Sequence, residues 1–171
     1  AFIFSMFGFT EAWAKNSDFI IEKGVLKEYK GNSKNVKIPN TVKSIGDFAF
    51  YGCSGIKKVT IPDSVKTIGK SAFDSCTNLT SISIPNSVKS IGENAFANCD
   101  NLKSVSLSDN IKTIDNSTFY FCSNLKKITI PANVKSIGRE AFFGCFSLKE
   151  VKFLGNKMTS IGDNAFVTVR V

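Results

Sequence analysis

Five cysteines recur along the chain at a constant interval of 23 residues. Thiols can form disulfides, hold metal ions or act as nucleophiles. No two of these cysteines are close enough in sequence for a C-x-x-C zinc pair, and five side chains pointing the same way in one column cannot all pair. We therefore interpret them as one column of small buried hydrophobic side chains. The column contains Cys53, Cys76, Cys99, Cys122 and Cys145.

The other residue types give no sign of catalysis. The sequence has no histidine, which excludes Ser-His-Asp and Cys-His catalysis and histidine metal sites. A column of hydroxyl side chains therefore lacks a partner base, and the carboxylates lie at turn or variable positions without a paired-acid arrangement. We predict that the protein is not an enzyme and has no catalytic, cofactor-binding or metal-binding residues. The hydroxyl column contains Ser44, Thr67, Ser90, Thr113, Ser136 and Ser160.

Lysines also form columns with the cysteine period. The chain carries 22 Lys or Arg against 14 Asp or Glu, a formal net charge of +8, and Arg139 and Arg170 are its only arginines. The first column contains Lys43, Lys66, Lys89, Lys112 and Lys135. The second is broken by Thr80 and contains Lys57, Lys103, Lys126 and Lys149. These nine lysines are the candidate interaction surface.

Two interpretations of the lysine columns stay open. Lysine is a compact point charge, so it favours a general positive potential over the bidentate recognition that arginine provides. The columns could therefore serve only as a solubilising face. Alternatively, they form a positive stripe that binds anionic glycans, acidic proteins or cell-envelope polymers. We expect no specific nucleic-acid binding.

All these columns belong to one repeated unit, I-P-[ND]-[ST]-V-K-[ST]-I-G-x-x-A-F-x-x-C-x-N-L-x-x-[IV]-[ST]. Residues 79–84 alternate apolar and polar side chains, which predicts a half-buried strand ended by the following proline. Such strands should stack in parallel at about 4.8 Å. The A-F-x-x-C stretch is too short for a full helix and predicts a helical or 3₁₀ turn on the outer side. The glycine after each Ile is expected to hold a turn with positive φ.

Stacking is needed because one unit cannot bury its own apolar face. A phenylalanine recurs in six units and should form a continuous core with the Ile, Val and Leu columns. We expect local irregularity where the repeat departs from its consensus, at Leu107-Ser108, Asp115, Thr118 and the last unit. The phenylalanine column contains Phe50, Phe73, Phe96, Phe119, Phe142 and Phe166.

The beginning of the chain differs from the repeat. Residues 1–14 are apolar at first and contain Ala12-Trp13-Ala14, which has the small-x-small form of a signal-peptidase site. We interpret them as the remnant of a signal peptide, with an apolar strand or the end of an upstream segment as the alternative. Residues 15–37 are expected to form an N-terminal capping hairpin with a turn at Lys23-Gly24. Residues 38–171 follow as the solenoid, without a stretch long and apolar enough to span a bilayer.

The units IPDSVKTIGKSAFDSCTNLTSIS and IPNSVKSIGENAFANCDNLKSVS resemble the BspA-type leucine-rich repeats of bacterial and protist surface proteins. The segment FIIEKGVLKEYKG resembles the hairpin that commonly opens such arrays, and the resemblance covers about residues 18–166. It implies an α/β, strand-dominated fold, a right-handed solenoid with a parallel sheet on one face. It also implies a secreted or cell-surface protein with a role in adhesion and protein binding. It transfers no binding residues, because the motif residues build the core.

From these observations we predict one leucine-rich-repeat solenoid of about six units. Its expected role is that of a non-catalytic adhesion or protein-binding module, with proteins or anionic glycans of a host or cell envelope as partners. Two alternatives remain open: a structural spacer or display stalk within a larger surface protein, and a non-specific polyanion binder.

Overall fold

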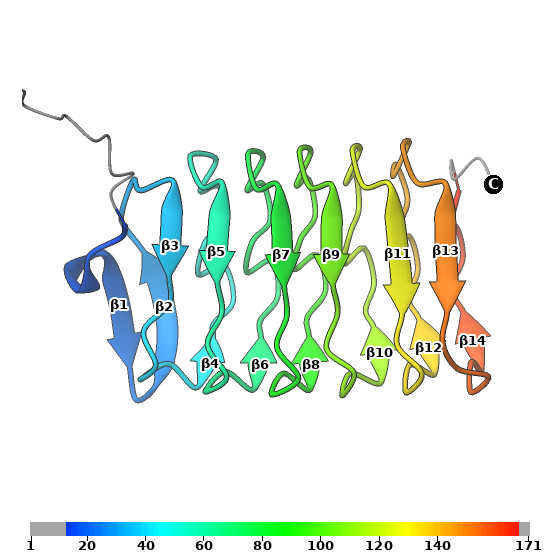
Figure 1. Ribbon diagram of the computed structural model, residues 1–171, viewed down its shortest axis with the longest axis horizontal. Coiled ribbons are helices and arrows are strands. Elements are labelled where there is room, and N and C mark those ends of the chain that lie inside the picture. Colours follow the sequence, from blue (N-terminus) through cyan, green and yellow to red (C-terminus); the bar gives the residue numbers. More distant parts are fainter. Residues whose placement is uncertain (1–12, 168–171) are drawn as a thin grey trace, which may run out of the picture.

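The repeats form short strands that stack into two sheets of an elongated solenoid (Figure 1). The computed structural model describes residues 13–167. Each coil of the solenoid contributes one strand to a front sheet, drawn pointing down in Figure 1, and one shorter strand to a back sheet, drawn pointing up. The sequence predicted the front strands but not the second sheet.

The two sets of strands have the following bounds. The front strands are β3 (Asn35–Lys37), β5 (Lys58–Thr60), β7 (Ser81–Ser83), β9 (Ser104–Ser106), β11 (Lys127–Ile130) and β13 (Glu150–Phe153). The back strands are β4 (Ser44–Ile45), β6 (Thr67–Ile68), β8 (Ser90–Ile91), β10 (Thr113–Ile114), β12 (Ser136–Ile137) and β14 (Ser160–Ile161). Because pairing is parallel and in register, equivalent residues of neighbouring coils lie side by side, as Ile68 and Ile91 do.

The pairing is interrupted in the fourth unit. Neither β9 with β11 nor β8 with β10 forms a hydrogen-bonded ladder, so each sheet is divided at this coil. Ser108 stands here in place of the proline, and its buried hydroxyl donates to the carbonyl of Val88 at 2.6 Å. Asp115 stands in place of the glycine, where burial, reinforced by the charge of Glu93, raises the pKa of its carboxyl. The irregularity expected from these substitutions is confirmed.

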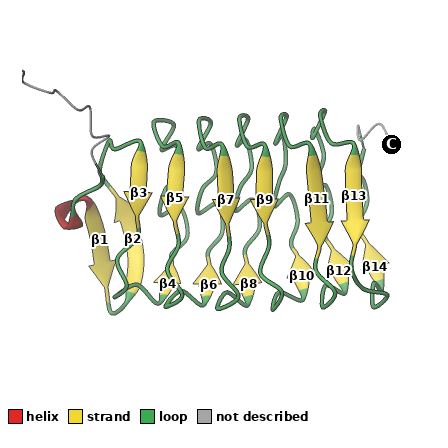
Figure 2. Cartoon of the chain, in the orientation of Figure 1, coloured by secondary structure: helices red, strands yellow, loops and turns green. Residues whose placement is uncertain are grey.

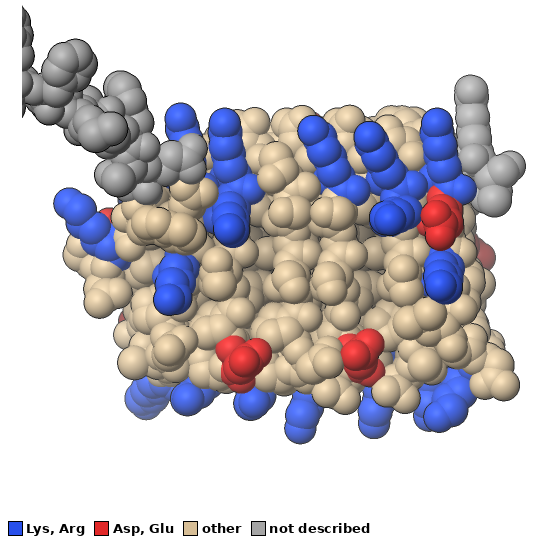
Figure 3. Space-filling model, in the orientation of Figure 1, with Lys and Arg blue, Asp and Glu red and all other residues tan. Residues whose placement is uncertain are grey.

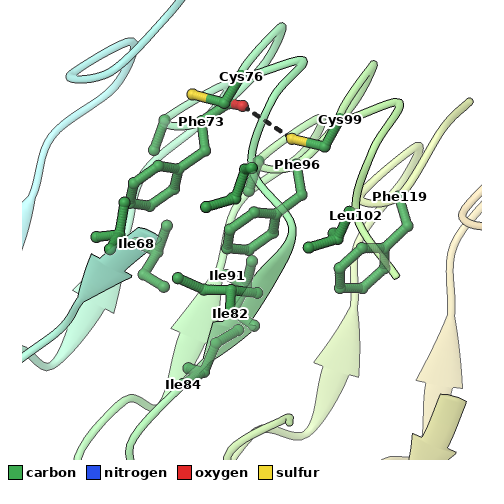
Figure 4. Packing of buried hydrophobic residues seen from close by; sticks show 14 of the residues in the cluster. Ile68, Phe73, Cys76, Ile82, Ile84, Ile91, Phe96, Cys99, Leu102 and Phe119 are labelled. Carbon is green, nitrogen blue, oxygen red and sulfur yellow. Dashed lines mark hydrogen bonds between the residues drawn. The ribbon is translucent and has the colours of Figure 1, made fainter. Parts of the chain in front are cut away.

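The core is a set of parallel columns between the sheets, as Figure 4 shows for the central coils. The phenylalanine rings stack from coil to coil, with centroids 4.8 Å apart for Phe50 and Phe73 and 5.2 Å for Phe73 and Phe96. Their planes lie 8° and 2° from parallel in these pairs. The column ends with Phe166, 5.2 Å from Phe142. Such contacts add to the free energy gained by burying each ring.

The prediction of short helical turns on the outer side is wrong. Between residues 13 and 167 the only helix is the 3₁₀ segment η1 (Asn16–Asp18), outside the repeats (Figure 2). The A-F-x-x-C stretch is instead a run of turns in which successive N–H groups alternate between two partners. The N–H of Phe50 donates to Ala72 of the next coil, whereas that of Tyr51 donates to Phe48 of its own turn. In a helix, all these N–H groups would bond to carbonyls of their own coil. Because alternate N–H groups bond to the next coil instead, this stretch does not form a helix.

The alternation depends on residues with a left-handed backbone conformation. In each turn, two positions recur with a positive φ. In the first coil these are Phe48 (φ 59°) and Gly52 (φ 69°), and each begins a set of equivalent residues in the later coils. The first set continues with Ser71, Asn94, Ser117, Glu140 and Asn164, and the second with Ser75, Asn98, Phe121 and Gly144. Serine, asparagine and glycine account for most of these positions, whereas phenylalanine and glutamate are costly there.

The glycine after each Ile does not need a positive φ, contrary to expectation. The described glycines with positive φ are Gly24, Gly52 and Gly144, and none follows an Ile. At Gly92, a Cβ would lie 2.7 Å from the backbone nitrogen of Lys70 in the preceding coil. At Gly138 the corresponding distance to Asn116 is 2.5 Å. Close packing between coils therefore requires glycine at this position.

A hairpin covers the first coil of the back sheet. Strands β1 (Phe19–Glu22) and β2 (Val25–Tyr29) pair antiparallel, and the turn residues Lys23 and Gly24 both have positive φ, as a two-residue hairpin turn requires. Strand β2 then pairs in parallel with β4, so Leu26 lies beside Ile45 and continues its column. Of the proposed signal-peptide remnant, residues 1–12 lie outside the described residues.

An asparagine ladder, which the sequence analysis did not predict, joins the turns before the front strands. The Nδ2 of Asn101 donates to the carbonyl of Thr77 in the preceding coil at 2.9 Å, and that of Asn124 donates to Asp100 at 2.7 Å. Each of these carbonyls also accepts the backbone N–H of the same asparagine, at 3.1 Å for Thr77 and 3.2 Å for Asp100, so the side chain adds a second bond between the coils. The N of the N-L pair therefore serves coil-to-coil bonding.

Candidate interaction surface

The two lysine columns lie at the starts of the two sheets. Lys66 directly precedes the back strand β6, and Lys103 directly precedes the front strand β9. Since front and back strands run in opposite directions, their starting ends lie on opposite margins of the solenoid (Figure 1). Figure 3 shows Lys and Arg gathered along these two margins, with few charges on the strand face between them. The nine predicted lysines thus form two separate rows rather than one surface.

Backbone bonds between coils hold each row in register, except between Lys89 and Lys112, where the back sheet is divided. The N–H of Lys89 donates to the carbonyl of Lys66 at 2.9 Å, and in the other row the N–H of Lys149 donates to Lys126 at 3.0 Å. Lys34 belongs to the second row as well, because its carbonyl accepts from Lys57 at 2.8 Å. The sequence analysis missed Lys34 because it precedes the first consensus unit.

Carboxylates do not neutralise these rows. Within residues 13–167 the ion pairs are Lys30–Glu28, Lys70–Glu93 and Arg139–Glu140, and all nine column lysines are exposed outside them. The Nζ of Lys66 approaches only the backbone carbonyl of Asp63, at 3.5 Å. Exposed, uncompensated lysines repeated at the spacing of parallel strands, about 4.8 Å, create a positive potential along each margin.

The strand face between the rows is shallow and mostly hydroxylic. A depression of about 270 Å³ is lined by Lys58, Thr60, Ser81 and Ser83 together with Pro85 and the strand backbone. It offers hydroxyl groups but no aromatic anchor, so it lacks the features that mark a small-molecule pocket or an interface hot spot.

The cysteine column is buried and structural. Within residues 13–167 all five thiols are free, and all except Cys53 are buried. The Sγ of Cys99 donates to the carbonyl of Phe73 at 3.2 Å, and that of Cys122 donates to Phe96 at the same distance. Burial raises the pKa of the Cys145 thiol to about 12 and that of Cys122 well above its usual value. A thiol held neutral in this way is a poor nucleophile and metal ligand.

The hydroxyl column also bonds within itself. Ser44 and Thr67, the first residues of β4 and β6, share a hydrogen bond between their hydroxyl groups. Groups of His, Cys, Asp or Glu that could hold a metal ion do not occur between residues 13 and 167. In the same range, no helix is long and apolar enough to cross a membrane.

One exposed feature breaks the repeat symmetry, and the sequence analysis did not recognise it. Four aromatic side chains from the turns of two adjacent coils lie together: Tyr120, Phe121, Phe143 and Phe146, named here the aromatic patch. The signal was present in the runs F-Y-F-C and F-F-G-C-F, which stand where the second and third units have F-D-S-C and F-A-N-C, while the first unit has F-Y-G-C.

Comparison with known proteins agrees with this architecture. The sequence profile of the BspA type leucine rich repeat region matches in six copies, over residues 20–123 and 54–170. The chain belongs to the BspA-type leucine-rich-repeat family. No catalytic family is indicated by this match. A comparison with curated proteins gives no match.

Solved structures of leucine-rich-repeat proteins share the fold. The T. pallidum leucine rich repeat protein is 25% identical with a TM-score of 0.75, over 92% of this chain and 89% of that one. A leucine rich cell surface protein from Faecalibacterium prausnitzii is 29% identical with a TM-score of 0.77, over 91% of this chain and 52% of that one. A leucine-rich repeat protein from Bacteroides ovatus is 33% identical with a TM-score of 0.66, over 86% and 45%. The chain thus spans about half the length of the latter two structures.

Proposed function

We propose that this solenoid is a non-catalytic adhesion module, exposed at a cell surface or secreted, whose lysine rows bind anionic proteins or glycans of a host or cell envelope. The observation that carries the proposal is the pair of exposed lysine rows, which form no ion pair with a carboxylate among residues 13–167. The description of the Faecalibacterium prausnitzii relative as a cell surface protein supports the location.

The energetics of the rows favour an extended anionic partner. Two lysine charges about 5 Å apart in water repel by under about 1 kcal/mol, so each row persists at small cost. A polymer with regularly placed negative charges relieves this repulsion and releases its counterions, so affinity should fall steeply with salt. A partner with a single charge gains little from the rows.

Replacing Lys66, Lys89 and Lys112 by Gln tests the proposal. The triple variant should elute from immobilised heparin at lower salt than the native chain. The slope of log K against log salt should shrink by roughly 0.7 to 0.9 for each lost contact, as it does for phosphates in nucleic acids.

A control with the same change in charge separates the rows from net charge alone. Lys15, Lys27 and Lys37 are exposed lysines outside the rows, and their replacement by Gln removes the same three charges. Equal losses of heparin affinity in both triple variants would show that binding is a non-specific attraction by net charge. If the row variant is retained as strongly as the native chain, the spacer alternative replaces the proposed function.

A further inference from the structure

The aromatic patch is packed as a unit. The rings of Tyr120 and Phe143 stack with centroids 5.5 Å apart, and Phe121 meets Phe146 edge to face at 5.8 Å. Phe146 is 56% exposed and the other three side chains are partly exposed. Aromatic side chains offer a large contact area at low conformational cost, which is why they dominate protein interfaces.

The repeat does not require these rings. In the two preceding coils the positions of Tyr120 and Phe121 hold Asp74 and Ser75, then Ala97 and Asn98, and those coils stack equally well. The patch is therefore an addition to the scaffold, unlike the buried phenylalanine column.

One ring of the patch stands at a turn position where the repeat imposes a left-handed backbone. Phe121 has a φ of 53°, a left-handed conformation that is costly for a large side chain. Its ring lies over Gly144, where a Cβ would come within 2.8 Å of the ring's Cδ2. The fold therefore does not favour phenylalanine at this position, where the equivalent residues are Gly52, Ser75, Asn98 and Gly144.

Positive charge adjoins the patch. Phe146 and Lys149 stand three residues apart, on either side of the buried Leu148, so their Cα atoms are at most about 11 Å apart. Residues 115–152, which contain the whole patch, carry six Lys or Arg and three Asp or Glu. Apolar rings beside uncompensated lysines complement a surface that is both acidic and apolar.

We infer that the aromatic patch, with Lys126 and Lys149 beside it, docks an acidic protein segment that bears apolar side chains. The inference rests on the proposed function and narrows it, because it assigns a protein partner to one end of the second lysine row. A sulfated glycan would satisfy the lysines but would bury little apolar area against the rings. The rings act as the anchors and the lysines select the charge of the partner.

Two fluorescein-labelled peptides of equal length and charge test this assignment by fluorescence anisotropy. One alternates Asp with Leu and the other alternates Asp with Ser. The native chain should bind the Asp-Leu peptide roughly tenfold more tightly, the difference made by one or two anchoring contacts. The double variant Phe121→Gly, Phe146→Ser should lose this preference. Glycine keeps the left-handed backbone without strain, so the variant should remain folded, as circular dichroism can verify.

The matched control lies in the first coil. Phe48 and Tyr51 are a second exposed aromatic pair, with centroids 5.8 Å apart, and Phe48 also has a positive φ of 59°. The double variant Phe48→Gly, Tyr51→Ser should keep the preference for the Asp-Leu peptide. A preference that survives the loss of Phe121 and Phe146, or disappears in the control, would overturn the assignment.

The peptides also separate this inference from the proposed function. Equal binding of both peptides by the native chain would overturn the inference, while the salt-dependent attraction of the lysine rows would stand. Failure to bind either peptide, together with no retention on heparin, would overturn both. Conversely, the double variant Lys126→Gln, Lys149→Gln should bind both peptides more weakly and preserve the ratio of their affinities.

Discussion

The Sγ of Cys99 donates a hydrogen bond to the carbonyl oxygen of Phe73, 3.2 Å away in the preceding coil (Figure 4). The same carbonyl also accepts the N–H of Cys76 in its own coil, at 3.2 Å. The cysteine column therefore links adjacent coils next to the stacked rings, and burial keeps its thiols protonated, so they can donate. The constant spacing of cysteine reflects this repeated bond between coils.

Removing one ring from the centre of the phenylalanine column should strongly destabilise the fold. Phe96 is fully buried between Phe73 and Phe119, so Phe96→Ala removes two ring contacts and leaves a cavity that a stacked array cannot close. We expect a loss of about 3 to 5 kcal/mol in the free energy of unfolding, measured by urea denaturation. Tyr51→Ala, at a position 57% exposed, should change it by no more than about 0.5 kcal/mol. Similar values for both variants would contradict the stacked core.

Adding a methyl group should have different effects on stability at two glycine positions. Gly92→Ala places a Cβ 2.7 Å from the backbone nitrogen of Lys70, so the two coils must move apart, at a cost of about 1 to 3 kcal/mol. At Gly55 nothing lies within 4 Å of the added Cβ, and Gly55→Ala should be neutral or slightly stabilising. Thermal unfolding of the two variants measures the difference. Equal melting temperatures would show that coil spacing does not depend on the glycine column.

Alkaline pH should destabilise the fold through the buried thiols. Burial raises the pKa of Cys145 to about 12 in the folded chain, whereas an unfolded thiol ionises near about 8.5. Between these values the unfolded chain loses the proton and the folded chain keeps it. The free energy of unfolding therefore falls as pH rises, by up to about 1.4 kcal/mol per pH unit for each buried thiol.

Denaturant titrations at a series of pH values above about 8.5 measure this slope. Cys145→Ala provides the comparison, because it removes one of the buried thiols. Its slope in this range should be shallower than that of the native chain. A slope that is identical in the variant would show that the Cys145 thiol does not contribute to the alkaline loss of stability.

Local patterns account for what could be predicted. Alternation around Ile82 determined a half-buried strand, and the recurrence of Phe96 and its equivalents determined a stacked column, because side-chain periodicity follows directly from strand geometry. The nine lysines lie in columns for the same reason, whereas their role as an interaction surface stays a prediction. Their division into two opposite rows could not be predicted, since it depends on the direction of the back strands, which are only two residues long.

The sequence by itself therefore determined the period and the buried columns. Tertiary structure decided why the glycines are needed, because the group that excludes a side chain at Gly92 lies in another coil. It also replaced the expected helical turns by alternating bonds between coils, such as that from Phe50 to Ala72. Only the folded chain brought Phe121 and Phe146 together beside Lys149, since partners from different coils meet only when the coils stack.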